Sequence, residues 1–437
     1  MICMLFLSQH ALAQDITNWS GDFELLREII LAEHPVFLQR NKYLLDSITE
    51  QVKIDFATHP DTAHFYFGVS RMLAVTGCGH TYLKRPEGTE FFRSAPGKIL
   101  VHHGKLYHGK ENQLAFTPSE DLELEKINDV GVEDLMRLFR QIASVDCISD
   151  ESYDAFIQER IQWWLQLYFH SPATWTLSFN QGGSFLVGNM SDTEVPMMER
   201  TSGFEILAGE ITTIGVLTLA DFDTGKRLIR QSFRMLNHCN ADILLIDLRG
   251  NQGGNGNIAD LVLGYLMDSV YYNVFQVKKG YGKFNRYFKG GDGLILSNER
   301  SNGPDDFESI FFKLHSRRKH HFSGKIYILT DRYTFSSASY LAARVSSRNN
   351  CVMLGERPSG GAASQGGGVI RNLVLPMSGA EVRFPKYKWD YQTDSAPSGN
   401  CFSPSDVQLL PYYIDFTDMR DDAMPAALDW ILQQESQ

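Results

Sequence analysis

The second half of the chain, from about residue 205, alternates short apolar strands with amphipathic helices, and this rhythm restricts the fold more than any other feature. Strand-like runs rich in Val, Ile and Leu occupy 214–219, 242–248, 273–277, 325–330 and 351–355. Helical periodicity separates them at 225–239, 258–267 and 336–345. Continuous apolar strands separated by helices are typical of a largely parallel sheet that is covered on both faces. The predicted class is therefore α/β.

A polar stretch at 278–323 interrupts this rhythm and is predicted to be an insertion. Its basic cluster, Arg317-Arg-Lys-His-His, is short, and such a run is most often a solvated loop. The whole chain has 41 Lys and Arg against 52 Asp and Glu, a net charge of −11. Phosphate contacts need a basic face, so we expect no nucleic-acid partner.

The first half is predicted to contain two further units. Residues 14–90 show helical periodicity and are expected to form a helical cap. Residues 91–204 read as a small mixed domain, with a hairpin around His103-Gly104 and helices at 132–142 and 153–168. The remaining residues, 205–437, form the α/β core.

The N-terminus and the cysteines indicate the compartment. A short apolar stretch ends in Ala11-Leu12-Ala13, the small-x-small pattern of signal-peptide cleavage, although no Lys or Arg precedes it. We expect a signal peptide at 1–13 and export to a bacterial periplasm; a merely apolar N-terminus is the alternative. No apolar run reaches the roughly 18 residues of a membrane-spanning helix. The six cysteines contain no CxxC pair, so they are predicted to be mostly buried thiols rather than zinc ligands or a dense disulfide framework.

Sites in open α/β sheets form where strands end at their carboxyl side, and three such loops are unusual here. The first is Asp247-Leu-Arg-Gly-Asn-Gln-Gly-Gly-Asn-Gly-Asn. Its glycines let backbone N–H groups approach developing negative charge, as in an oxyanion hole. A tight strand-to-helix turn explains them equally well. A phosphate loop fits poorly, since the Gly-Lys-Ser/Thr ending is missing.

The second and third loops follow later strands. Thr330-Asp-Arg-Tyr-Thr-Phe-Ser-Ser-Ala-Ser places Ser336 in the first turn of a helix, where the positive field suits a nucleophile. Serine is also a common N-cap, so a purely structural role stays open. The glycine-rich stretch 355–368 could line a cleft or form a surface turn.

A nucleophilic serine needs a base to accept its proton. Among the 13 histidines, His80 stands apart because it follows two glycines that bracket a cysteine, in Val75-Thr-Gly-Cys-Gly-His-Thr. A single histidine is more often structural than catalytic, so His80 gains weight only in combination with the other segments.

Together these segments resemble the C-terminal processing peptidase family of serine peptidases, which includes the tail-specific proteases and the catalytic core of tricorn protease. The motifs are Gly215-Val-Leu-Thr-Leu, Leu245-Ile-Asp-Leu-Arg-Gly-Asn-Gln-Gly-Gly, Leu329-Thr-Asp-Arg-Tyr-Thr-Phe-Ser-Ser-Ala-Ser, Leu354-Gly-Glu-Arg-Pro-Ser-Gly-Gly and, more thinly, Gly77-Cys-Gly-His-Thr. The resemblance implies a crotonase/ClpP-like core, a degenerate PDZ-like module within 91–204, a peptide or protein substrate, and no metal or organic cofactor.

The resemblance also assigns roles to residues. It places the nucleophile at Ser336 and the oxyanion hole at the Ser337 amide with Gly253 and Gly254. Bacterial processing peptidases carry a general-base lysine 25 residues after the serine, but this chain has Gly361 there. The tricorn-like branch uses an upstream histidine instead, which falls on His80.

The third catalytic member is less defined. In the tricorn-like branch an acidic residue stands near a segment that corresponds to Asn400-Cys-Phe-Ser-Pro-Ser-Asp, and none stands at the expected place here. Asp394 and Asp390 are the nearest substitutes. The leading hypothesis is thus an exported serine peptidase acting by acyl transfer. Alternatives are a catalytically inactive member that binds a peptide or lipid-like ligand and, less well supported, an acyl-CoA enzyme on the related crotonase fold.

Overall fold

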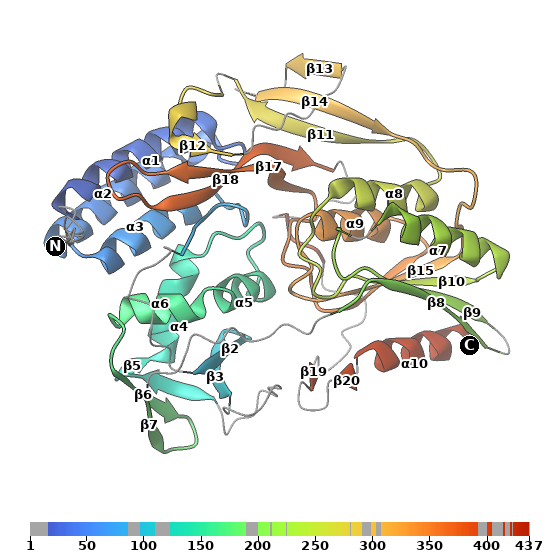
Figure 1. The fold of residues 1–437 in the computed structure, drawn as a ribbon, viewed down its shortest axis with the longest axis horizontal. Helices are drawn as coiled ribbons and strands as arrows, with labels where there is room; N and C mark the ends of the chain where they lie inside the picture. Colours follow the sequence, from blue (N-terminus) through green and yellow to red (C-terminus); the bar gives the residue numbers. More distant parts are fainter. Residues whose placement is uncertain are drawn as a thin grey trace, which may run out of the picture.

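The computed structural model arranges most of the chain around a largely parallel sheet and a separate antiparallel sheet (Figure 1). The residues described are 16–85, 97–109, 123–188, 200–209, 212–223, 225–279, 281–290, 299–302, 307–391, 400–403, 414–415, 420–421 and 423–436. The expected signal peptide at 1–13 lies outside these ranges. Within them, no helix combines the length and the apolarity needed to cross a membrane.

Three helices form the N-terminal part, where the sequence predicted helical structure: α1 (Ser20–Glu33), α2 (Lys42–Thr58) and α3 (Thr62–Ala74). Their apolar faces meet in an aromatic cluster, in which the rings of Phe23 and Phe56 lie within 6 Å of Phe65. The Asp61 carboxylate caps α3 by accepting a hydrogen bond from the His64 amide at 2.9 Å. The loop that leaves α3 carries His80.

A small α+β region follows. It contains the hairpin β2 (Lys98–His102) and β3 (Lys105–Gly109), a sheet of order β5-β4-β6-β7, and three helices. The strands are β4 (Leu124–Ile127), β5 (Val130–Gly131), β6 (Thr174–Phe179) and β7 (Ser184–Gly188), and the helices are α4 (Val132–Ile142), α5 (Asp150–Gln158) and α6 (Ile161–Tyr168). These helices share one apolar core with α1–α3.

The prediction of one continuous helix over 153–168 is wrong, because α5 and α6 are separate. The chain leaves helical geometry at Arg160, with φ −123° and ψ −12°. Its guanidinium donates to the Phe156 carbonyl at 2.9 Å and lies over the rings of Phe156 and Tyr82. These contacts hold the break between the two helices.

The predicted α/β class and largely parallel sheet are confirmed, but the strand expected at 273–277 is β11 (Tyr271–Lys278), which pairs antiparallel with its neighbours in the other sheet. The largely parallel sheet has the order β16-β15-β10-β9-β8, with bounds β8 (Gly203–Ala208), β9 (Thr213–Thr218), β10 (Ile243–Asp247), β15 (Lys325–Thr330) and β16 (Cys351–Gly355). All neighbours are parallel except β8, which pairs antiparallel with β9. Alternate residues of each strand face opposite cores. One core contains α7 (Lys226–His238), α8 (Gly256–Leu266) and α9 (Ser337–Ser346), and the other contains α10 (Ala423–Glu435) (Figure 1).

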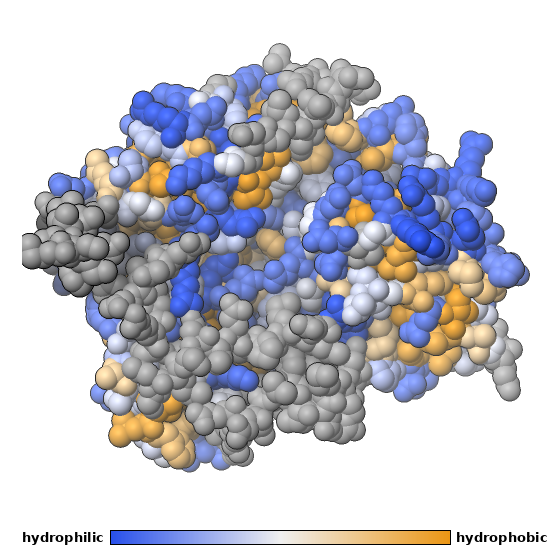
Figure 2. All heavy atoms as spheres, in the orientation of Figure 1, coloured by the Kyte–Doolittle hydropathy of each residue, from blue (hydrophilic) through white to orange (hydrophobic). Residues whose placement is uncertain are grey.

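Helix α7 has one face of apolar residues against the core and one face of charged residues at the surface. Helix α7 turns Ile229, Phe233 and Leu236 inward and presents Arg230 and Arg234 to solvent. Figure 2 shows the hydrophilic side chains that gather over this helix.

The prediction that 278–323 is a polar interruption is only partly right. Strands β12 (Phe288–Lys289), β13 (Glu299–Asn302) and β14 (Phe307–Leu314) lie within it and join an antiparallel sheet of order β12-β17-β18-β11-β14-β13. The other members are β11 (Tyr271–Lys278), β17 (Ser364–Val374), β18 (Glu381–Asp390) and β1 (Tyr82–Leu83), which pairs with β18. Strand β14 buries Phe307, Ser309 and Ile310, an irregular pattern that its polar neighbours conceal in the sequence.

Candidate active site

Ser336 immediately precedes α9 (Ser337–Ser346), at the end of the loop that follows β15. Its backbone has φ 54° and ψ −126°, a conformation that non-glycine residues rarely adopt. The side chain makes no capping hydrogen bond to the helix. Instead, Oγ lies 3.0 Å from Nε2 of His80. The structure therefore favours the nucleophile hypothesis over the N-cap alternative.

His80 reaches Ser336 from the loop between α3 and β1, a segment 256 residues away in the chain. Its ring stacks on Phe335 with centroids 4.6 Å apart. Gly79 makes this approach possible, because a Cβ there would lie 2.8 Å from the Phe335 ring and 3.2 Å from Oδ2 of Asp146. Gly77 has φ 59°, which only glycine adopts without strain. Both glycines around Cys78 thus have a structural reason.

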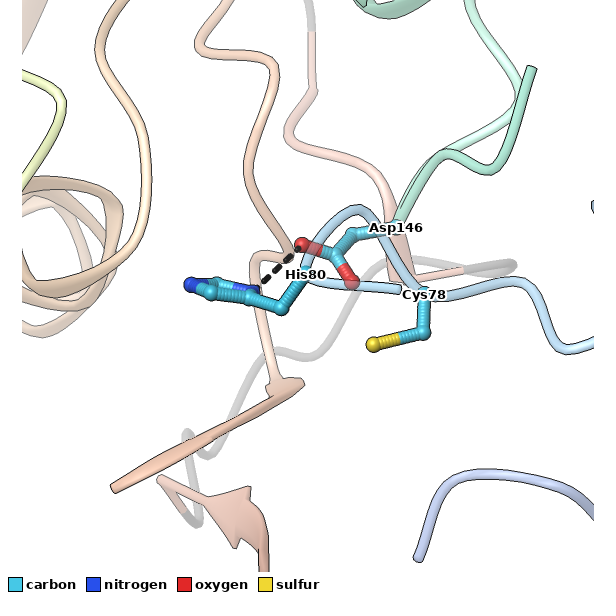
Figure 3. A group of neighbouring side chains, drawn as sticks. All are labelled: Cys78, His80 and Asp146. Atoms are coloured by element: carbon cyan, nitrogen blue, oxygen red, sulfur yellow. Dashed lines mark ion pairs between the residues drawn. The ribbon is translucent and has the colours of Figure 1, made fainter. Parts of the chain in front are cut away.

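Asp146 lies behind the histidine, between α4 and α5. Its Oδ2 faces Nδ1 of His80 at 3.9 Å (Figure 3). Its Oδ1 accepts a hydrogen bond from the Gly79 amide at 3.0 Å. Among the described residues, neither Oδ2 of Asp146 nor Nδ1 of His80 has a hydrogen-bond partner, and both atoms are buried. A shift of about 1 Å would join them in a hydrogen bond.

Burial controls the protonation of this pair. It lowers the pKa of His80 to about 3, and the positive charge of Arg383 acts in the same direction. Burial also raises the pKa of Asp146 to about 7, with the Gly79 amide partly opposing it. The imidazole is therefore neutral at pH 7, the state in which it can accept a proton.

The sequence did not identify Asp146. Of the two acids it offered, Asp394 lies outside the described residues. Asp390 ends β18, and its carboxylate pairs with Lys388 at 3.1 Å, so the acid that faces His80 is a different one. No local motif surrounds Asp146, and contacts with residues far away in the sequence, such as its hydrogen bond from the Gly79 amide, bring it into place.

A disulfide and an asparagine hold the segment that carries Asp146. Cys147 and Cys401 are joined, and only Cys78 among the other described cysteines is buried, so the prediction of mostly buried thiols is wrong. Next to them, Nδ2 of Asn400 donates to the carbonyls of Asp146 at 3.1 Å and Ser364 at 2.7 Å. The segment Asn400-Cys401 thus ties the Asp146 backbone to the start of β17.

The glycine loop after β10 lies against Ser336. A Cβ on Gly253 would lie 2.6 Å from Cβ of Ser336, so no side chain fits there. The Gly253 amide already donates to Oδ1 of Asn251 at 2.8 Å. Within the described part of the chain, by contrast, the amides of Gly254 and Ser337 have no acceptor. Of the three predicted hydrogen-bond donors, the amides of Gly254 and Ser337 are therefore available to a substrate oxygen. Gly253 instead allows the loop to lie close to Ser336, because it has no side chain.

No lysine is among the described residues that line the cleft around Ser336. A Cβ on Gly361 would lie 2.0 Å from the Ser364 carbonyl oxygen, which excludes any side chain at the position of the processing peptidases' lysine. Lys386 is buried with Nζ 5.1 Å from the ring centre of Tyr281, and Lys388 pairs with Asp390. His80 is the base that the geometry offers.

The Ser336 and His80 side chains open into a cleft of about 780 Å³. Its walls come from the N-terminal region, the parallel sheet and the antiparallel sheet. They include Tyr82, Glu159, Arg160, Gln252, Gly254, Asp260, Phe275, Phe312, Ser359, Gly367, Arg383 and Trp389. The stretch 355–368 contributes Ser359 and Gly367, so it lines the cleft, one of its two predicted roles.

One group of side chains in the described ranges has atoms placed as metal ligands could be. Sγ of Cys78, Nδ1 of His80 and Oδ2 of Asp146 all lie within 4.8 Å of one another (Figure 3). Burial raises the pKa of Cys78 to about 12, which keeps this ligand a neutral thiol. The absence of a cofactor stays a prediction.

Comparison with known proteins identifies the core. Residues 213–396 match the family model described as Peptidase family S41. This domain belongs to peptidase family S41. The predicted enzyme class, a serine-type peptidase, is thereby confirmed. The matched segment contains Ser336 and the glycine loop, whereas His80 and Asp146 lie before it, outside the S41 domain.

Solved structures extend the similarity along the chain. Mature CPAF complexed with lactacystin has a TM-score of 0.58 at 12% identity, with 95% of this chain and 97% of that chain covered. The photosystem II D1 C-terminal processing protease gives 0.43 at 13% identity, covering 93% and 98%. Tricorn protease gives 0.41 at 12%, covering 97% and 37%. No curated protein matches the chain in sequence. At such identities, the CPAF structure supports a common fold that includes the N-terminal region.

Proposed function

We propose that this chain is an exported serine peptidase that hydrolyses peptide bonds by acyl transfer. Ser336 is the nucleophile, His80 is the general base, and Asp146 orients His80. The observation that carries the proposal is the 3.0 Å distance between Nε2 of His80 and Oγ of Ser336, two residues that lie 256 positions apart in the sequence. A hydroxyl within hydrogen-bond reach of a neutral imidazole is the arrangement that activates a serine.

The chemistry begins when Oγ of Ser336 attacks the scissile carbonyl and Nε2 of His80 takes its proton. Nε2 can accept only if the imidazole hydrogen sits on Nδ1. Asp146 selects this tautomer, because its Oδ2 faces Nδ1 and can accept that hydrogen. The carboxylate also stabilises the imidazolium that forms. The present separation of 3.9 Å would shorten on substrate binding, as catalytic hydrogen bonds often do.

The negatively charged oxygen of the tetrahedral intermediate needs hydrogen-bond donors. We assign this role to the amides of Gly254 and Ser337. Oγ of Ser337 donates to the Gly254 carbonyl at 3.1 Å, which holds the two segments in register. One such donor typically contributes about 3 kcal/mol to transition-state stabilisation. His80 then returns its proton to the leaving amine, and water hydrolyses the acyl-enzyme by the same route.

Export and domain roles are part of the proposal. The disulfide between Cys147 and Cys401 fits an oxidising compartment such as the periplasm, as does the sequence pattern at 1–13. We assign 14–90 as the cap, 91–204 as a degenerate PDZ-like module and 205–437 as the crotonase/ClpP-like peptidase core. The turn between β4 and β5, followed by α4, supports the module assignment.

The alternative is a silent member that binds a peptide or lipid-like ligand in the same cleft. This alternative does not explain the unusual backbone conformation of Ser336 or its contact with His80. Incubating the purified chain with an unfolded protein and with mixed fluorogenic peptides separates the two. We expect fragments from the wild type and none from Ser336→Ala. Equal fragment yields from both chains would overturn the proposal.

A further inference from the structure

Gly256, Asp260 and Trp389 line one part of the cleft beside Ser336, which we call the Asp260 pocket. Gly256 is the first residue of α8, and a Cβ there would be 3.7 Å from Oγ of Ser337 and 3.4 Å from the ring of Trp389. One helical turn further, Asp260 lines the same cleft. A side chain at position 256 would therefore occupy the space between Ser337 and Trp389.

Aromatic rings form the walls of this pocket. Trp389 stacks on Phe275 with centroids 5.3 Å apart and contacts Tyr340 at 4.3 Å. Phe312 lines the same part and contacts Phe275 edge-on. Trp389 is 5% exposed, and its Nε1 has no hydrogen-bond partner among the described residues. The walls are therefore apolar and aromatic, with one unused donor.

Asp260 supplies a negative charge inside these walls. Its carboxylate accepts a hydrogen bond from the Tyr340 hydroxyl at 2.7 Å, and that hydroxyl accepts one from Nδ2 of Asn273. Across the described ranges, Asp260 has no ion-pair partner within 4.0 Å, although the positive charge of Arg344 lies near enough to lower its pKa against the larger, raising effect of burial. The nearby Arg344 instead donates to the Tyr272 carbonyl and to Oδ1 of Asn273. Burial raises the pKa of Asp260 to about 6, so the group is ionised at pH 8.

The direction of the reaction tells which part of a substrate enters this pocket. His80 must protonate the leaving amine, so the leaving half lies on the His80 side. We therefore place the acyl half, with the residue that supplies the scissile carbonyl, toward Ser337, whose amide we assign to the tetrahedral oxygen, and toward Gly256 beside it. Its side chain is thus the one that reaches Asp260.

We propose that this pocket selects a lysine or arginine side chain at the residue whose carbonyl is attacked. The aromatic walls suit an aliphatic stem and a cation over ring faces, and Asp260 supplies the counter-charge. The inference rests on the proposed peptidase function and names the chemical class of its substrate.

The test uses the full-length protein and five fluorogenic peptides that differ only at this residue: Lys, Arg, Leu, Phe or Glu, at pH 8. We expect kcat/KM for Lys and Arg to exceed that for Leu and Phe at least tenfold and that for Glu at least a hundredfold. Asp260→Asn keeps a hydrogen-bond acceptor for Tyr340. It should reduce the Lys-to-Leu ratio of kcat/KM at least tenfold.

Asp268→Asn is the matched control. Asp268 follows α8, its side chain is 72% exposed, and it pairs with Arg348 outside the cleft. Its removal changes the net charge equally and should leave the Lys-to-Leu ratio within twofold. Wild-type cleavage with no preference for Lys and Arg, or an unchanged ratio in Asp260→Asn, would overturn the pocket assignment alone. No cleavage of any peptide would overturn the proposed peptidase function and the pocket with it.

Discussion

The two halves of the molecule contribute to the candidate site in different ways. Ser336 and the Gly253-Gly254 loop follow β15 and β10, which are parallel neighbours, so their carboxyl ends lie side by side in one sheet. His80 and Asp146 come from loops after α3 and α4, in a region that shares no strand with that sheet. The S41 match covers the first set and not the second.

This difference separates what a sheet determines from what packing determines. Strand order alone brings the nucleophile to the glycine loop. The base and its acid depend on three further restraints: Gly79 against Phe335, the hydrogen bonds of Asn400, and the disulfide. Variants of the N-terminal set should therefore abolish catalysis while leaving the α/β core folded. The predictions below test this, from the largest effect to the smallest.

Removing the nucleophile should have the largest effect. Ser336→Ala should lower kcat about 10⁵-fold to 10⁶-fold, as for other serine peptidases. Ser336→Gly should be equally inactive, yet at least as stable as the wild type, because glycine tolerates φ 54° without strain. Thermal unfolding and peptide hydrolysis measure the two properties. Residual activity above one per cent in either folded variant contradicts the assignment.

Removing the base should be nearly as severe. His80→Gln and His80→Ala should each reduce kcat at least 10⁴-fold, because no other described base lies within reach of Oγ of Ser336. The far-UV circular dichroism of both should match the wild type, since the α/β core does not depend on this loop. A His80 variant with wild-type turnover would return His80 to a structural role.

Neutralising the acid should reduce the rate less and change its pH profile. Asp146→Asn should lower kcat about 10²-fold to 10⁴-fold, because the amide can stabilise the wrong imidazole tautomer. In the wild type, the carboxyl with a pKa of about 7 must ionise, so kcat/KM should rise from pH 6 to pH 8. His80, with its pKa near 3, stays neutral over this range. The variant should lose that rise; an unchanged profile would exclude Asp146.

Opening the disulfide should have an intermediate effect. In Cys147→Ala with Cys401→Ala, Asn400 alone would hold the Asp146 segment, so we expect an activity loss of about tenfold and a stability loss of about 2–4 kcal/mol. Cys239→Ala is the control and should change neither property, because Cys239 is a partly exposed free thiol at the C-terminal end of α7. Denaturant unfolding and peptide hydrolysis measure the two properties. If the double variant and Cys239→Ala have the same stability and activity, the disulfide does not hold the Asp146 segment.

Removing the lysines should have the smallest effect. Lys386→Ala and Lys388→Ala should retain activity within about threefold, because neither side chain lines the cleft. Lys386→Ala should lower the melting temperature slightly through lost packing on Tyr281. If either lysine variant is inactive while His80→Gln is active, a Ser-Lys mechanism replaces the one proposed here.

The sequence predicted the parts that depend on local pattern. Periodic apolar residues predicted β9, β10, β15 and β16 and the helices α7, α8 and α9 of the core, but not β8 or α10. Glycine spacing marked the loops around Gly253 and His80. The Gly361 position correctly excluded a lysine, for a reason the structure supplies: the Ser364 carbonyl occupies the space of its Cβ.

The parts that depend on distant packing were not predictable. Asp146 has no neighbouring motif, and the next residue, Cys147, forms a disulfide with a cysteine 254 residues away. Strands β13, at the sheet edge, and β14, next to it, were not predicted because they lie within a largely polar stretch of the sequence. The Gly253 amide matched the family pattern, but the Asn251 side chain two residues earlier already accepts its hydrogen bond.

Covalent labelling with a fluorophosphonate tests most directly whether the two halves form one catalytic unit. The reagent reacts only with an activated hydroxyl, and mass spectrometry locates the modified serine. We predict one label per wild-type chain, on Ser336. The labelling rate should fall at least a thousandfold in His80→Gln. Asp146→Asn should also be labelled more slowly than the wild type. Labelling of another serine, or an unchanged rate at Ser336 in His80→Gln, would contradict this account.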